Sequence, residues 1–233
     1  MANFLSFDSR EAMVAAITAD TRTRLEAALG KSGEARWAVS GGSTPAPLFA
    51  AMADADMAWQ NVKVALVDER WVEADHARSN TAFLRRTLLT GKAVDAAFTP
   101  MKVPGDDPFA AASQVDATYK ALDPFDVVLL GMGPDGHTAS LFPSAEGLEA
   151  AMQPDDAATV RAIRANRSDV TGDEVLRLTL TLGALTRAGA VQLMITGDDK
   201  KAVYDAATDP ASNLPIGRVA RALGDRLSVY WAA

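Results

Sequence analysis

The strongest constraint on the fold is the alternation, along the chain, of short apolar runs with segments of helical periodicity. Apolar runs typical of β-strands occur at 36–39, 62–67, 126–130, 159–164, 175–181, 191–196 and 227–231. Helical patterns are found at 8–30, 45–55, 79–89, 107–122, 200–207 and 216–223. Because strands joined by crossover helices lie parallel, this order predicts an α/β fold with a mostly parallel sheet and helices on both faces.

The run 126–130 is the most apolar of the predicted strands, so we place it at the centre of the sheet. Neither an internal repeat nor a low-complexity linker interrupts the alternation. The chain has 233 residues, of which 48% are apolar and 23% charged. These values are ordinary for a globular protein. We therefore expect one domain over residues 1–233.

The composition excludes several classes of protein. The chain has no cysteine and only two histidines, which excludes disulfide frameworks, zinc fingers and thiol nucleophiles. Its formal net charge of −7 argues against a nucleic-acid or anionic-membrane surface. No apolar run reaches the roughly 18 residues of a membrane helix, and the N-terminus lacks the pattern of a secretory signal. We expect a cytoplasmic protein, monomeric or a small homo-oligomer, that binds neither nucleic acid nor membrane.

The first polar motif, Ser40–Pro45, follows the strand predicted nearest the N-terminus. Gly41 and Gly42 let the main chain turn its N–H groups inward, and Ser43 and Thr44 add hydroxyl donors. A helix that starts at this motif points its positive end at the loop. No Gly-Lys-Ser/Thr follows, so the motif is not a P-loop. The pattern favours a phosphate-binding turn and a plain capped strand-to-helix turn about equally.

A second glycine-rich motif follows the central strand. Gly131, Gly133 and Gly136 match the G-x-G-x-x-G spacing of dinucleotide-binding loops. Asp135 stands inside this loop, where it would repel a pyrophosphate, so we do not expect NAD to bind. His137 follows that carboxylate by two residues. An imidazole titrates near neutrality, and the flanking glycines and carboxylate favour a general base over a purely structural histidine.

Charged residues stand at or near the ends of other strands. Asp68 and Arg70 follow the strand at 62–67; a carboxylate there can orient a substrate hydroxyl or the base, and a guanidinium can grip a phosphate. Arg177 interrupts an apolar run, either as an edge residue or as a cation aimed into the site. Lys200 opens a helix, where a cation indicates an anionic ligand. Since ligands bind at the carboxyl ends of parallel strands, we expect these groups to lie close together.

Together these motifs resemble the 6-phosphogluconolactonase family, in order and over nearly the whole chain. The most specific segment is Gly131–Pro143, with the sequence GMGPDGHTASLFP. Further matching segments are Ser40–Pro45, Asp68–Trp71 with Ser79-Asn80, Arg177–Thr181, Ile195–Lys200 and Pro215–Val219. The resemblance implies a Rossmann-like domain shared with glucosamine-6-phosphate deaminases. It also implies hydrolysis of 6-phospho-D-glucono-1,5-lactone to 6-phosphogluconate without metal or cofactor, the second step of the oxidative pentose phosphate pathway.

The resemblance further implies roles for single residues. His137 would be the general base that activates water against the lactone carbonyl, with its imidazole oriented by Asp135 or Asp68. The residues implied to bind the substrate and its phosphate are Gly41, Gly42, Ser43, Thr44, Arg70, Arg177 and Lys200.

Two other functions stay open at this point. The related deaminases have Asn-Glu-Pro a few residues after the histidine, and here Phe142 stands in place of that glutamate. Ring opening and amine loss need an acid/base carboxylate, so Phe142 favours lactone hydrolysis. A non-catalytic sugar-phosphate-binding protein would keep Arg70 and Lys200 and would not need His137.

Overall fold

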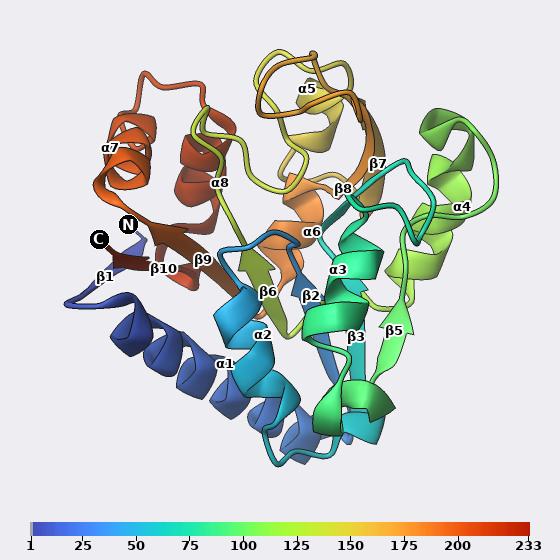
Figure 1. Cartoon of the computed structure of the whole chain (residues 1–233). Helices are drawn as coiled ribbons and strands as arrows, with labels where there is room; N and C mark the ends of the chain where they lie inside the picture. Colours follow the sequence, from blue (N-terminus) through green and yellow to red (C-terminus); the bar gives the residue numbers. More distant parts are fainter. Residues whose placement is uncertain (1) are drawn as a thin grey trace.

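The computed structural model describes residues 2–233, and its centre is a seven-stranded sheet (Figure 1). In spatial order the strands are β1 (Asn3–Phe7), β10 (Leu227–Ala232), β9 (Ala190–Thr196), β6 (Val127–Leu130), β2 (Ala35–Val39), β3 (Val62–Leu66) and β5 (Ala97–Thr99). Every neighbouring pair in this sheet is parallel. The predicted parallel sheet is therefore confirmed, and the run that we placed at its centre is the middle strand.

The strand order is that of a doubly wound, Rossmann-like fold. From β2 the chain runs outward through β3 to β5, then returns to β6 and runs outward on the other side through β9 and β10. The direction of winding reverses between the adjacent strands β2 and β6. In such sheets a ligand binds at the carboxyl ends of the strands next to this reversal. Both glycine-rich motifs start there.

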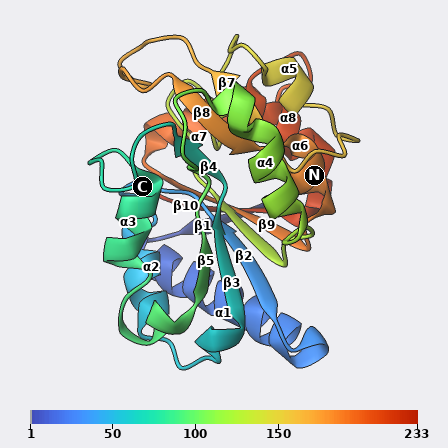
Figure 2. The ribbon, with the colours of Figure 1, turned by 90° about the vertical axis from the view of Figure 1, so that its right-hand side faces the viewer.

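Helices cover both faces of this sheet, as predicted. They are α1 (Arg10–Ser32), α2 (Ala46–Ala53), α3 (Asn80–Thr87), α4 (Pro108–Lys120), α5 (Leu148–Ala151), α6 (Leu182–Arg187), α7 (Asp198–Ala207) and α8 (Pro215–Leu223). Short 3₁₀ turns occupy 59–61, 91–95 and 224–226. Helix α1 contacts β2, β6 and β10, and α7 contacts β9. Figure 2 shows α1 and α2 on one side of the sheet and α7 and α8 on the other.

The longest helix, α1, begins and ends two residues later than the pattern predicts. The Ser9 hydroxyl accepts a hydrogen bond from the Ala12 N–H at 3.1 Å, which caps the first turn. Gly33 ends the helix with φ of +80°, a conformation that favours glycine. Among residues 2–233, no helix is both long and apolar enough to cross a membrane.

Three strands form a second, separate sheet. These are β4 (Asp68–Arg70), β8 (Leu176–Leu180) and β7 (Val160–Arg164), in that order and antiparallel. The strands expected at 159–164 and 175–181 therefore exist but lie outside the parallel sheet. Their pattern contains the reason, since Leu176–Leu180 alternates apolar and polar residues, which is typical of antiparallel pairing. The edge strand β1 and the strands β4 and β5 were not expected. Strands β4 and β5 have only three residues each, too few for a distinctive periodicity.

Candidate active site

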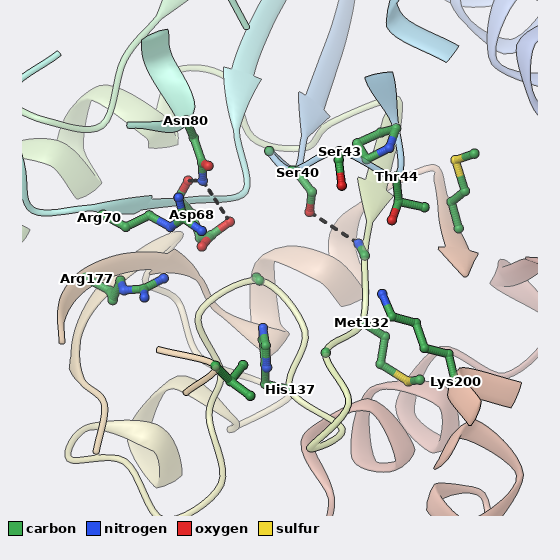
Figure 3. Close-up of a pocket in the computed structure, with 18 residues that line it drawn as sticks. Ser40, Ser43, Thr44, Asp68, Arg70, Asn80, Met132, His137, Arg177 and Lys200 are labelled. Carbon is green, nitrogen blue, oxygen red and sulfur yellow. Dashed lines mark hydrogen bonds between the residues drawn. The ribbon is translucent and has the colours of Figure 1, made fainter. Parts of the chain in front are cut away.

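A pocket of about 440 Å³ lies at the carboxyl ends of β2 and β6 (Figure 3). The loops after these strands form one part of its wall, the small sheet forms another, and Lys200 at the start of α7 adds a third. The residues predicted from the sequence that line it are Gly41, Gly42, Ser43, Thr44, Asp68, Arg70, His137, Arg177 and Lys200. Asp135 is the remaining predicted residue, and it lies behind the wall in contact with His137.

His137 is held by the carboxylate two residues before it. Its Nδ1 lies 2.5 Å from Oδ1 of Asp135, and its main-chain N–H donates to the same oxygen at 3.2 Å. Burial raises the pKa of Asp135, but the hydrogen bond and charge of His137 outweigh burial and leave that pKa below its usual value. An ionised carboxylate favours the tautomer with the proton on Nδ1. The lone pair of Nε2 is then the free one, on a ring that projects into the pocket (Figure 3).

The glycines of this loop make room for the histidine. A Cβ at Gly133 would lie 2.1 Å from Cε1 of His137 and 2.2 Å from its Nδ1. Gly136 has φ of +75°, and a Cβ there would also meet the side chain of Leu214 at 3.0 Å. Gly133 is therefore explained by the packing of the imidazole, and Gly136 by its positive φ and its contact with Leu214.

Asp68 belongs to a different hydrogen-bond network from His137. Its Oδ2 accepts from the Ser140 hydroxyl at 2.6 Å, and its main-chain oxygen accepts from Nδ2 of Asn80 at 2.8 Å. Within the described residues, the hydrogen-bond partner of the imidazole is Asp135. Of the two carboxylates left open by the sequence, Asp135 is thus the one placed to orient the ring, and Asp68 faces the cavity from β4.

Arg70 and Arg177 stand directly opposite each other in the pairing of β4 with β8. Arg177 is only 2% exposed, and it donates to the main-chain oxygens of Glu174 at 2.6 Å and Thr171 at 3.0 Å. Burial, and then the charge of Arg70, lower the pKa of Arg177 to about 10, so it stays charged at neutral pH. Arg70 donates from Nη1 to the main-chain oxygen of Arg78. The edge-residue interpretation of Arg177 is wrong, because β8 is the central strand of its sheet.

The loop after β2 and Lys200 lie on the other side of His137 from the two arginines (Figure 3). Gly42 has φ of +100°, and a Cβ at Gly41 would lie 2.0 Å from Oδ1 of Asn80. The loop is therefore built for glycine, with the main chain at Gly41 pressed close to Asn80 at the start of α3. Burial lowers the pKa of Lys200. Lys201 instead pairs with Asp205 at 2.7 Å outside the cavity, so Lys200 is the one of these two lysines that lines the pocket.

Several residues that line the pocket, and Ser140 that contacts one of them, were not assigned a role from the sequence. Asn80 and Ser140 had a signal, since each is a polar residue within a matching motif, but their link to Asp68 depends on tertiary contacts. Met132, Met194 and Val170 also line the cavity. Their apolar side chains have no sequence signature that separates them from core residues.

The second histidine of the chain, His76, does not line the pocket. His76 is exposed, and its Nδ1 accepts from the main-chain N–H of Arg78 at 3.2 Å. Across residues 2–233 we find no group of three or more histidine or acidic side chains arranged to hold a metal ion. The expectation of metal-free chemistry stays a prediction.

Comparison with known proteins gives a consistent result. A family model described as glucosamine-6-phosphate isomerases/6-phosphogluconolactonase matches residues 8–231. A 6-phosphogluconolactonase from Caulobacter vibrioides is 39% identical over 227 residues, covering 97% of this chain and 96% of the relative. One from Mesorhizobium japonicum is also 39% identical, covering 99% of this chain and 95% of the relative.

The solved structures agree. A crystal structure of a 6-phosphogluconolactonase from Shewanella baltica superposes with a TM-score of 0.91 at 34% identity, covering 100% of this chain and 98% of the other. A monomeric glucosamine-6-phosphate deaminase shares the fold, with a TM-score of 0.79 at 15% identity. Fold, site and relatives make this protein an enzyme of the ester-hydrolase class. The chain belongs to the glucosamine-6-phosphate isomerase/6-phosphogluconolactonase family.

Proposed function

We propose that this enzyme hydrolyses 6-phospho-D-glucono-1,5-lactone to 6-phospho-D-gluconate, with His137 as the general base. The single observation behind the proposal is the pairing of Asp135 with Nδ1 of His137 at 2.5 Å, on a ring that projects into a pocket with cations on either side. The names of the relatives supply the substrate, and the geometry supplies the roles.

The reaction starts with a proton transfer. Nε2 of His137 takes a proton from water, and the resulting hydroxide attacks the lactone carbonyl at C1. Asp135 stabilises the imidazolium that forms. When the tetrahedral intermediate collapses, the C1–O5 bond breaks and the imidazolium gives its proton to the departing ring oxygen. The products are a free carboxylic acid and a hydroxyl, and the base returns to its starting state.

The negative charge that develops on the carbonyl oxygen needs hydrogen-bond donors. The N–H of Gly136 is already used, because it donates to the main-chain oxygen of Gly133 at 3.1 Å. The N–H groups of Gly41 and Gly42 are the candidates that remain from the glycine-rich loops. The guanidinium groups of Arg70 and Arg177 lie on the same side of His137 as Asp68 and add positive charge there (Figure 3).

The phosphate belongs on the opposite side of His137, with Lys200. Figure 3 shows the Lys200 amine on the side of Ser43 and Thr44, at the start of α2. Hydroxyls, inward main-chain N–H groups and the positive end of a helix form an environment that suits a phosphate. A substrate that extends from Lys200 toward Arg70 would pass over the imidazole, which puts its carbonyl within reach of the base.

The experiment that tests this proposal is His137→Ala, assayed with the phospholactone after subtraction of spontaneous hydrolysis. General acid–base catalysis contributes roughly 10²- to 10⁴-fold, so kcat should fall by about that factor. Binding of 6-phosphogluconate, measured by calorimetry, should change little. Full activity in the variant would remove His137 from the mechanism. Binding without turnover in the unmodified enzyme would instead favour a sugar-phosphate-binding protein.

A further inference from the structure

One aromatic ring contacts both the base and the buried cation of the site. Phe142 is 3% exposed, and its ring stacks on the His137 imidazole with centroids 4.1 Å apart and planes inclined by 29°. Cζ of Arg177 lies 5.2 Å from the centre of the same phenyl ring. Phe142 therefore lies where the loop after β6 meets the small sheet, and no step of the proposed reaction uses it.

We propose that Phe142 is a positioning residue for lactone hydrolysis, which fixes the plane of the His137 imidazole and keeps that face of the ring free of charge and water. The inference rests on the proposed function of His137. The hydrogen bond to Asp135 fixes the direction of Nδ1 but does not by itself prevent the ring plane from tilting. A phenyl ring stacked at 4.1 Å limits this tilt, and the edge of the imidazole is confined on the Gly133 side.

The charges around the imidazole show why a neutral ring suits this position. The charged groups that surround it are Asp135 in its own loop, Asp68 and Arg70 on β4, Arg177 on β8 and Lys200 on α7. With Phe142 on its face, the imidazolium is paired with Asp135 alone. A second carboxylate there would favour the protonated ring and would also pair with Arg177. The phenyl ring therefore keeps Nε2 available as a base and Arg177 available to the substrate.

The stacking can be observed directly, because the chain has only two histidines. Phe142→Leu should shift the imidazole proton resonances of His137 downfield, since the ring current of the stacked phenyl is lost. The resonances of His76, which is exposed and distant in the sequence, serve as the reference and should not move. Unchanged His137 resonances in a folded variant would overturn the inference.

The kinetic test separates positioning from binding. Misplacement of a reacting group by about 1 Å lowers rates by up to about 100-fold, so Phe142→Leu should lower kcat by about 10- to 100-fold while KM changes less than about twofold. Phe142→Tyr keeps the ring and should keep most of the activity. Phe142→Met, which fills the volume without a ring, should behave like Phe142→Leu and serves if the leucine variant is unstable.

The matched control is another buried phenylalanine. Phe49 is fully buried and packs edge-on against Trp37 at 6.1 Å between centroids, in the core beneath α2. Phe49→Leu should lower the melting temperature and leave kcat unchanged. If Phe142→Leu does the same, Phe142 is a core residue only. That result leaves the proposed function intact, whereas full activity of His137→Ala removes the base that Phe142 would position.

The pH profile tests the role of charge. The substitutions Phe142→Glu and Phe142→Gln introduce side chains of similar volume, and only Phe142→Glu places a carboxylate beside the imidazole. The acid limb of the pH profile of kcat/KM should lie about one pH unit higher in the glutamate variant than in the glutamine variant. Coincident acid limbs in the two variants would show that the charge at this position does not reach the base.

Discussion

The two sheets of this protein contribute to the site in different ways. The parallel sheet contributes loops, namely the Gly41–Thr44 turn after β2 and the His137 loop after β6. The antiparallel sheet contributes strand residues directly, with Asp68 and Arg70 on β4 and Arg177 on β8. In the first region the main chain bends to present donors and a base. In the second, paired strands fix the direction of charged side chains.

The side chains of Arg177 and Asp68 on the small sheet are held by more hydrogen bonds than that of the histidine in the loop after β6, and this difference fits their proposed roles. A buried charge on a strand needs partners, and both Arg177 and Asp68 have them within their own sheet and its neighbours. His137 has one partner and one free nitrogen, with 18% of its side chain exposed, so a proton can enter and leave. We infer that the small sheet positions the substrate and the loop after β6 carries out proton transfer. Substitutions in the small sheet should then change KM, and substitutions in the loop should change kcat.

The largest effect in this comparison is expected for Asp135→Asn. The pKa of Asp135 lies below its usual value, so the group is ionised throughout the neutral range and holds the proton on Nδ1. An amide removes this charge and permits the wrong tautomer. We expect kcat to fall by about 100-fold with little change in KM. Asp106→Asn, at an exposed position, is the control and should be fully active. An effect on KM alone would contradict the division between loop and sheet.

A somewhat smaller decrease in kcat is expected for Gly133→Ala. The new Cβ would lie 2.1 Å from Cε1 of His137, so the imidazole must move. We expect a 10- to 100-fold lower kcat, about what a displacement of 1 Å produces. Gly30 in α1 has no atom within 4 Å of an added Cβ, and Gly30→Ala should leave kcat unchanged and stabilise the fold by about 0.5–1 kcal/mol. Equal kcat values in the two variants would show that the imidazole tolerates the displacement.

The two cationic sides of the pocket should respond differently to the substrate phosphate. Lys200→Met should raise KM for the phospholactone by about tenfold, as expected for loss of a charged hydrogen bond. It should not change KM for phosphate-free glucono-1,5-lactone. Arg70→Ala should raise KM for both substrates, because the proposed substrate orientation places the lactone ring beside Arg70. Lys201→Met is the matched control, since Lys201 pairs with Asp205 outside the cavity. If Arg70→Ala raised KM only for the phospholactone while Lys200→Met did not, the phosphate would be assigned to Arg70 instead of Lys200.

The smallest effect concerns the attachment of the small sheet. Asp116 on α4 accepts hydrogen bonds from the N–H groups of Thr159 and Val160 at 2.6 and 3.0 Å. Burial raises the pKa of Asp116, but the bonds from Lys120 and from these N–H groups outweigh it and lower the pKa overall. Because the pKa of Asp116 is lower in the folded protein than in the unfolded chain, its carboxylate stabilises the fold at pH values above the pKa of the unfolded state. This contribution is lost as the pH falls through the pKa of the folded state.

Asp116→Asn should therefore lower the melting temperature by about 2–8 °C at pH 7, which corresponds to about 1–2 kcal/mol. The difference from the unmodified enzyme should shrink below about pH 4. Melting curves across pH 3–7 measure this, with the exposed Asp95→Asn as control. A difference that does not depend on pH would mean that the Asp116 charge does not hold the sheet.

Much of the parallel sheet could be predicted from the sequence, because its strands are apolar throughout and are separated by helices with recognisable periodicity. The two glycine-rich loops could be predicted as well, since a strand followed by glycines and polar residues indicates a ligand loop. The small sheet could not be predicted as a unit, although its strands β7 and β8 were expected. Its strand β4 has only three residues, and the partner of Arg177 across the sheet is more than 100 positions away in the sequence.

The candidate site shows the same division. His137 and Asp135 are two residues apart, so the sequence makes Asp135 a candidate partner of the imidazole, but it does not choose between Asp135 and Asp68. The contacts of Asp68 with Ser140, and of Phe142 with Arg177, join segments far apart in the chain. Local pattern has no information about such contacts, because they depend on how the small sheet packs against the loop after β6.

The sequence by itself determined the order of strands and helices, the loops that bear the chemistry and the family to which they are similar, because these follow from local periodicity and short motifs. Only the tertiary structure decided which carboxylate orients His137, that Lys201 pairs with Asp205 outside the cavity, and that the arginines lie across the imidazole from Lys200. The reason is geometric. Side-chain direction and distance are set by strand pairing and helix packing between segments that the chain separates widely.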